Sequence, residues 1–117
     1  MDMREYASKV SDTAVHPNKL PAGKHKNLVG LLYCATKLCG EAGEVSEVIG
    51  KALRDDGGTF PPARMANVVK EMGDVFWYMF RIMELLEIPY EQVLEANIHK
   101  LADRQERGKL LGDGDNR

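Results

Sequence analysis

The chain has 117 residues, 44% of them hydrophobic and 29% charged, which is the composition of an ordinary single domain with one core. Its net charge of −2 gives no general attraction to nucleic acid or to anionic membranes, so we expect neither as a partner. No apolar run approaches the ~20 residues that a transmembrane helix needs, and the N-terminus lacks a signal-peptide pattern, so we expect a cytoplasmic protein.

Four helices are predicted in chain order. Apolar spacing indicates a short helix over residues 1–13, and a loop with two prolines and a glycine follows at 16–26. A long helix is expected over 28–54, because the Asp-Asp-Gly-Gly sequence after it is a stop signal. Two prolines begin a third helix over 62–87, which an Ile-Pro pair ends. A fourth helix is expected over 90–107.

These helices predict an all-α, four-helix-bundle-like domain over residues 1–107, because no strand alternation competes with them. The Gly- and Asp-rich tail, 108–117, is expected to be mobile. A two-helix hairpin of this kind has a broad apolar face, so we also expect a helical homo-oligomer. Apolar residues at helical spacing on the third helix are expected to fill the core: Phe76, Phe80, Met72, Met79 and Met83. Trp77 lies on a different face of this helix, which permits an oligomer contact or base stacking.

The segment GEAGEVSEVIGK, residues 40–51, carries the first pair of candidate metal ligands. At about 100° per residue, Glu41 falls inside the apolar stripe of its helix and Glu44 lies on the shoulder of that stripe. Glu47 lies further round, toward solvent. A carboxylate within an apolar face is costly unless a partner neutralises it. Glu41 is therefore difficult to explain as ordinary solvated surface.

The second acidic pair is Glu71 and Asp74, at one edge of the apolar face of the third helix and about 60° apart. If the two edges meet, four carboxylates converge, and their mutual repulsion favours a bound cation. Oxygen-only ligands suit a hard divalent ion, for which Mg²⁺ is the natural candidate in phosphate chemistry. Gly40, Gly43 and Gly73 adjoin the acids, which we interpret as close approach by a neighbouring helix or as room for a ligand.

Three ordered segments resemble the MazG-like nucleotide pyrophosphohydrolases: GEAGEVSEVIGK, EMGDVFWYM and the downstream NIHKLADRQERG. The resemblance implies an all-α NTP pyrophosphatase fold, dimeric or tetrameric. It also implies that nucleoside triphosphates are hydrolysed to the monophosphate and pyrophosphate with Mg²⁺, for which Mn²⁺ is a possible substitute. Carried over by position, the metal ligands would be Glu41, Glu44, Glu71 and Asp74. The residues that contact the nucleotide or its phosphates would be Asn97, Lys100 and Arg104. The GDGDNR ending is not part of the general family pattern.

Several alternatives remain open from the residues alone. The general base that takes a proton from water is either Glu44 or Glu47, and the sequence does not choose between them. Lysines one turn away from the acids are candidates for ordinary intrahelical salt bridges. Lys100 and Arg104 are likewise candidates for pairing with their neighbours Asp103 or Glu106, or with the acids of another helix. Phosphoribosyl-ATP pyrophosphohydrolysis is an alternative activity. A non-enzymatic helical oligomer that merely binds metal is the alternative from another class.

Overall fold

The computed structural model describes residues 1–17 and 27–117, so most of the predicted loop at 16–26 lies outside the described residues. This part of the chain forms four helices: α1 (Met3–Thr13), α2 (Leu28–Asp55), α3 (Pro62–Leu85) and α4 (Tyr90–Glu106). The prediction of an all-α fold is confirmed. None of the helices in the described ranges is both long and apolar enough to cross a membrane.

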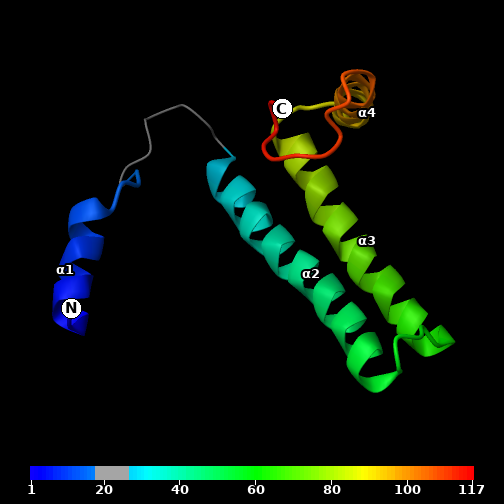
Figure 1. Ribbon diagram of the computed structural model, residues 1–117, viewed down its shortest axis with the longest axis horizontal. Coiled ribbons are helices and arrows are strands. Elements are labelled where there is room, and N and C mark those ends of the chain that lie inside the picture. Colours follow the sequence, from blue (N-terminus) through cyan, green and yellow to red (C-terminus); the bar gives the residue numbers. More distant parts are fainter. Residues whose placement is uncertain (18–26) are drawn as a thin grey trace.

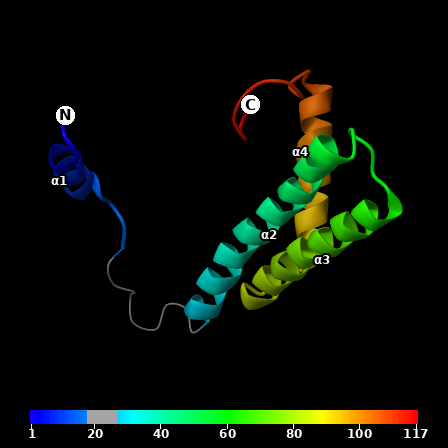
Figure 2. The same ribbon diagram turned by 90° about the horizontal axis from the view of Figure 1, so that it is seen from below.

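Helices α2 and α3 lie side by side as an antiparallel hairpin, which forms the packed centre of the molecule (Figures 1 and 2). Part of the predicted apolar stripe of α2 faces inward, since Val48 is buried and Ala52 has no exposed surface, whereas Ile49 is 38% exposed. The connection between the helices contains Gly57 with a φ of 64°, which a residue with a side chain adopts only at a cost. An ion pair between Arg64 and Asp56, 2.6 Å long, ties the connection to the start of α3.

Helix α3 ends in a left-handed turn at Glu87, whose φ of 56° is positive. The Ile88 N–H donates to the carbonyl of Met83 at 2.9 Å, and the Glu87 N–H donates to the carbonyl of Glu84 at 3.2 Å. These two bonds form the Schellman pattern, which normally places glycine where Glu87 stands. The chain then changes direction, and α4 leaves the hairpin steeply (Figure 2).

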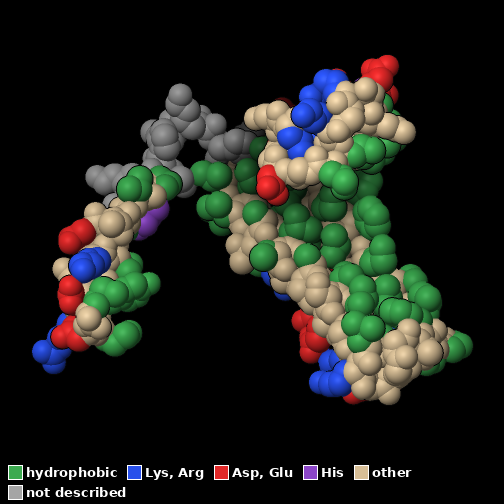
Figure 3. Space-filling view, viewed as in Figure 1, with side chains coloured by type: hydrophobic (Ala, Val, Ile, Leu, Met, Phe, Trp, Pro, Cys, Tyr) green, Lys and Arg blue, Asp and Glu red, His purple; other side chains and the backbone are tan. Residues whose placement is uncertain are grey.

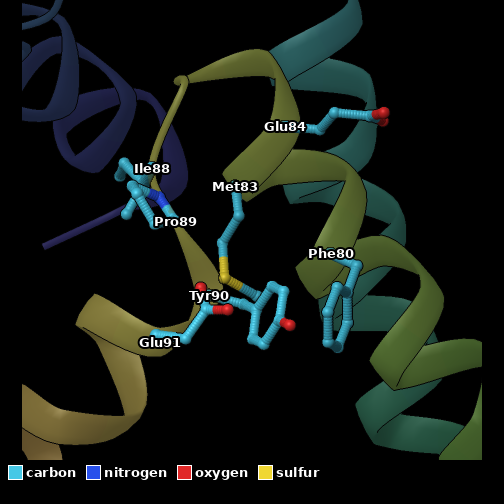
Figure 4. Close-up of a pocket in the computed structure, with 7 residues that line it drawn as sticks. All are labelled: Phe80, Met83, Glu84, Ile88, Pro89, Tyr90 and Glu91. Carbon is cyan, nitrogen blue, oxygen red and sulfur yellow. The ribbon is translucent and has the colours of Figure 1, made fainter.

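A small pocket lies in the corner between α3 and α4 (Figure 4). Phe80 and Tyr90 face one another across it, with ring centroids 5.8 Å apart. The lining of the pocket is mostly apolar and contains none of the predicted site residues. The residues that line it are Phe80, Met83, Glu84, Ile88, Pro89, Tyr90 and Glu91. Beyond this corner α4 makes few contacts with the hairpin.

The prediction that the aromatic residues of α3 belong to the core was wrong for the single chain. Phe76 and Phe80 are 54% and 50% exposed, whereas the 60% exposure of Trp77 agrees with its expected place on a different face. Met72 and Met79, also expected in the core, are exposed as well. The reason is that α3 is apolar on more than one side, and one neighbouring helix covers only one of them. Hydrophobic side chains consequently gather along the visible face of the hairpin (Figure 3).

Candidate metal centre

Three carboxylates from two helices converge near the middle of the hairpin. Glu41 comes from α2, Glu71 and Asp74 come from α3, and one oxygen of each lies within 4.8 Å of the others. Glu41 and Glu71 are half-buried, whereas Asp74 is exposed. The i and i+3 spacing of Glu71 and Asp74 places both on the same side of α3. The structure therefore brings together three of the four carboxylates that the sequence singled out.

Lys37 pairs with Glu41 at the border of the buried face. Its Nζ lies 3.5 Å from Oε1 of Glu41, and the Glu41 side chain is only 17% exposed. The negative charge of Glu41 raises the pKa of Lys37, with smaller contributions from Tyr78 and Tyr33. The intrahelical salt bridge that the sequence left open is thus present. Its ammonium group neutralises part of the negative charge beside the three carboxylates.

The two candidate general bases have different surroundings. Glu47 is engaged with Lys51, whose Nζ lies 3.0 Å from Oε1 of Glu47. The hydrogen bond from Lys51 lowers the pKa of Glu47. Glu44 is exposed and takes part in no ion pair within the described ranges. It also stands outside the group of three converging carboxylates.

The three glycines beside the acids are open rather than tightly packed. A Cβ atom built on Gly40, Gly43 or Gly73 would meet no heavy atom within 4 Å, apart from the immediate helix backbone. The interpretation that a neighbouring helix approaches closely is therefore wrong within the single chain. Room for a ligand, the other interpretation, remains compatible with the structure.

The predicted substrate residues lie on α4, apart from the carboxylates. Asn97 and Lys100 are exposed, whereas Arg104 is buried, with 5% of its surface exposed. Because α4 has few contacts with the hairpin, the structure does not bring these residues against the acidic group. Of the alternatives left open for these cations, pairing with Asp103 is not found, since Asp103 pairs with Arg107 at 2.7 Å.

Sequence reasoning missed the partner of these cations, which is Asp115 in the C-terminal tail. Its Oδ1 lies 3.2 Å from Nη2 of Arg104 and 3.3 Å from Nζ of Lys100. The hydrogen bonds from Arg104 and then Lys100 lower the pKa of Asp115. An acidic residue among glycines, shortly after the helix that carries Lys100 and Arg104, is the signal that points to such a contact. Composition indicates chain freedom there, but it does not show where the tail folds.

An apolar groove of about 260 Å³ adjoins the acidic group on the hairpin. Its lining comes from both helices: Ala42, Val45, Met72, Val75, Phe76 and Met79. Ala42 and Met72 directly follow Glu41 and Glu71 in the chain. Since these side chains offer no hydrogen-bonding groups suited to a base edge, the groove has the character of a helix-packing surface.

Comparison of the sequence with known proteins shows which family it belongs to. Residues 31–108, two thirds of the chain, match the MazG nucleotide pyrophosphohydrolase domain. The chain belongs to the MazG family. It is also 37% identical over 112 residues to the "Gene 37 protein" of Mycobacterium phage L5, and the match covers 96% of each chain. No solved structure gives a significant match.

Membership of the MazG family makes nucleotide pyrophosphohydrolysis the general activity and implies a divalent metal. The acidic group fits such an ion, because its three donors are carboxylate oxygens drawn from two helices and held within 4.8 Å. Hard divalent cations prefer such donors, whereas zinc sites are built mainly from Cys and His. The MazG match contains this group and all of α4, and it ends at residue 108, before most of the C-terminal tail.

Proposed function

We propose that this MazG-family chain hydrolyses nucleoside or deoxynucleoside triphosphates to the monophosphate and pyrophosphate, with water attacking the α-phosphorus. The observation that carries the proposal is the convergence of Glu41, Glu71 and Asp74 within the segment that matches MazG. These oxygen donors suit Mg²⁺, with Mn²⁺ as a substitute. A divalent ion bound there neutralises phosphate charge and lowers the pKa of water.

Metal binding, proton acceptance and phosphate binding are assigned to different residues of the chain. Glu41, Glu71 and Asp74 would hold the ion, with Glu44 as the fourth ligand or as the proton acceptor. We assign the proton acceptor to Glu44 rather than Glu47, because the Lys51 contact lowers the pKa of Glu47 and weakens Glu47 as a proton acceptor. Lys100 and Arg104 would donate charge-assisted hydrogen bonds to phosphate oxygens. Asn97, one turn before Lys100, would add a neutral donor.

The test is a panel of NTPs and dNTPs, incubated with Mg²⁺, Mn²⁺ or EDTA, with the products separated by chromatography. Reaction in ¹⁸O-labelled water then shows which phosphorus is attacked. We expect the label in the monophosphate and unlabelled pyrophosphate, with turnover lost in EDTA. Label in orthophosphate, released together with a diphosphate, would mean attack at the γ-phosphorus and would refute the mechanism. If no triphosphate reacts, phosphoribosyl-ATP is the next substrate.

Two matched variants separate the acidic group from general surface charge. Glu71→Gln removes a converging carboxylate and should lower kcat by about 100-fold or more, since even residues that only support metal ligands cost 10- to 100-fold. Glu84→Gln makes the same change on the same helix, at an exposed residue that pairs with Arg81. It should leave turnover within about twofold of the unmodified chain. Equal activity of the two variants would favour a non-enzymatic role for the acidic group.

We further propose that a second copy of the chain covers the exposed apolar face of the hairpin, giving a homodimer or a homotetramer. Phe76 carries this argument, because it lines the apolar groove and yet is 54% exposed. Large apolar patches on a protein surface usually mark an interface. Sedimentation velocity should show an oligomer that Phe76→Lys dissociates, whereas Phe60→Lys, in the α2–α3 connection, should not dissociate it. A monomer at all concentrations would refute the proposal.

A further inference from the structure

The C-terminal loop, defined as residues 108–117, folds back beside α4 (Figure 2). At the end of α4, Gly108 adopts a φ of 66°, and the Lys109 N–H donates to the carbonyl of Arg104 at 2.7 Å. The guanidinium of Arg117 then closes the loop, donating to the carbonyls of Lys109 and Leu110 at 3.2 Å each and to that of Gly114. The loop is therefore held by its own hydrogen bonds as well as by α4.

Within this loop, Asp115 takes both cations of α4 with a single carboxylate oxygen. Its Oδ1 lies 3.2 Å from Nη2 of Arg104 and 3.3 Å from Nζ of Lys100. The same nitrogen of Arg104 also donates to the backbone carbonyl of Asp115. The Arg104 side chain is 6% exposed and the Asp115 side chain is 81% exposed. The arginine is thus covered, while the carboxylate that it binds lies in solvent.

A carboxylate in this position takes the place that a phosphate oxygen would take. Both anions accept charge-assisted hydrogen bonds from arginine and lysine. Lys100 and Arg104 lie four residues apart on one face of α4, so a single anionic group reaches both. The Arg104 and Lys100 contacts lower the pKa of Asp115, so its carboxylate is ionised at neutral pH.

We propose that the C-terminal loop is a built-in competitor, in which Asp115 occupies the Lys100–Arg104 pair and a phosphate-bearing ligand must displace it to bind there. The inference rests on the proposed function only for the assignment of phosphate as the ligand of this pair. Displacement is feasible because the carboxylate of Asp115 is exposed and its pair with Lys100 is exposed on both sides, and such pairs contribute little free energy. Release also uncovers Arg104, which then offers its donors to the incoming anion.

The neighbouring acid in the loop provides a matched control. Asp113 lies two residues before Asp115 in the same loop, and it makes no ion pair or side-chain hydrogen bond among the described residues. Asp113→Asn and Asp115→Asn therefore remove the same charge from the same loop. Only Asp115→Asn removes the carboxylate from the cations.

The test measures binding of inorganic pyrophosphate to the 117-residue chain by calorimetry, in EDTA so that the acidic group of the hairpin takes no part. At about 0.15 M ionic strength, Asp115→Asn should bind pyrophosphate about three- to tenfold more tightly than the unmodified chain, because it loses the exposed pair with Lys100 and the partly buried pair with Arg104. Asp113→Asn should change the affinity by less than about twofold, and Lys100→Gln should weaken binding. Circular dichroism checks that each variant is folded.

Four results would overturn the proposal. If Asp115→Asn binds pyrophosphate more weakly, Asp115 supports the cations instead of competing for them. The proposal also fails if Asp115→Asn leaves the affinity unchanged, if Asp113→Asn raises the affinity equally, or if no variant binds pyrophosphate. None of these depends on hydrolysis. A chain without pyrophosphohydrolase activity can still show the competition, and an active enzyme can lack it, so the two proposals fail separately.

Discussion

Replacing Glu87 by glycine should stabilise the protein, although it removes a side chain and adds no contact. Glu87 is an exposed residue held at a φ of 56°, at the position after α3 where helices commonly carry glycine. The left-handed conformation costs a residue with a Cβ atom about 1–2 kcal/mol. Glycine avoids this cost but loses about 0.5–1 kcal/mol more backbone entropy on folding. The net gain expected for Glu87→Gly is about 0.5–1 kcal/mol.

The assay is thermal and urea unfolding followed by far-ultraviolet circular dichroism, at one fixed protein concentration because self-association shifts the midpoint. For a chain of this size, the gain corresponds to a rise in Tm of about 2–5 °C. Glu95→Gly is the control, since Glu95 is exposed in the middle of α4 and the same change there should destabilise by about 1 kcal/mol. Loss of stability in both variants would refute the argument from the left-handed turn.

Three further predictions follow from the hairpin and the C-terminal loop. Lys37→Gln removes the cation that pairs with Glu41 and competes with a metal ion for this carboxylate. Mg²⁺ binding measured by calorimetry should therefore tighten about two- to fivefold. Weaker Mg²⁺ binding would contradict this and would mean that Lys37 positions the carboxylate. Ala52→Leu adds volume where no surface is exposed and should cost about 1–3 kcal/mol in urea unfolding, whereas Ala66→Leu on exposed α3 surface should cost little. Because the pKa of Asp115 is lowered in the folded chain, its pairs stabilise the loop above the ordinary aspartate pKa of about 3.9 and are lost as the pH falls through the lowered value. The NMR shift of the Arg104 guanidinium should therefore titrate below about pH 4, and Asp115→Asn should abolish that titration.

The helices and the acidic group were accessible from the sequence because both depend on short-range pattern. Pro62 at the entry of α3 and Gly57 after α2 mark helix ends by local chemistry. The helical phase of Glu41 placed it on the packed face, where the structure finds it half-buried. Convergence of Glu41 with Glu71 and Asp74 then follows from the antiparallel hairpin.

The parts that sequence reasoning missed depend on which surfaces meet. Periodicity shows that Phe76 and Phe80 lie on an apolar face of α3, but it does not show whether α2, another helix or a second chain covers that face. Asp115 was missed for a related reason. Its contact with Lys100 joins residues fifteen positions apart through a loop, and the glycines of that loop allow many other conformations.

The hairpin also sets an order of assembly. All three converging carboxylates lie within residues 41–74, on two helices joined by one short connection, so their convergence requires no later part of the chain. During synthesis, α2 and α3 emerge before α4, and we expect the acidic group to form as soon as α3 has left the ribosome. The cations Lys100 and Arg104 follow later, and Asp115 comes after both of them. The loop that competes for the cations therefore reaches them only after α4 has been synthesised.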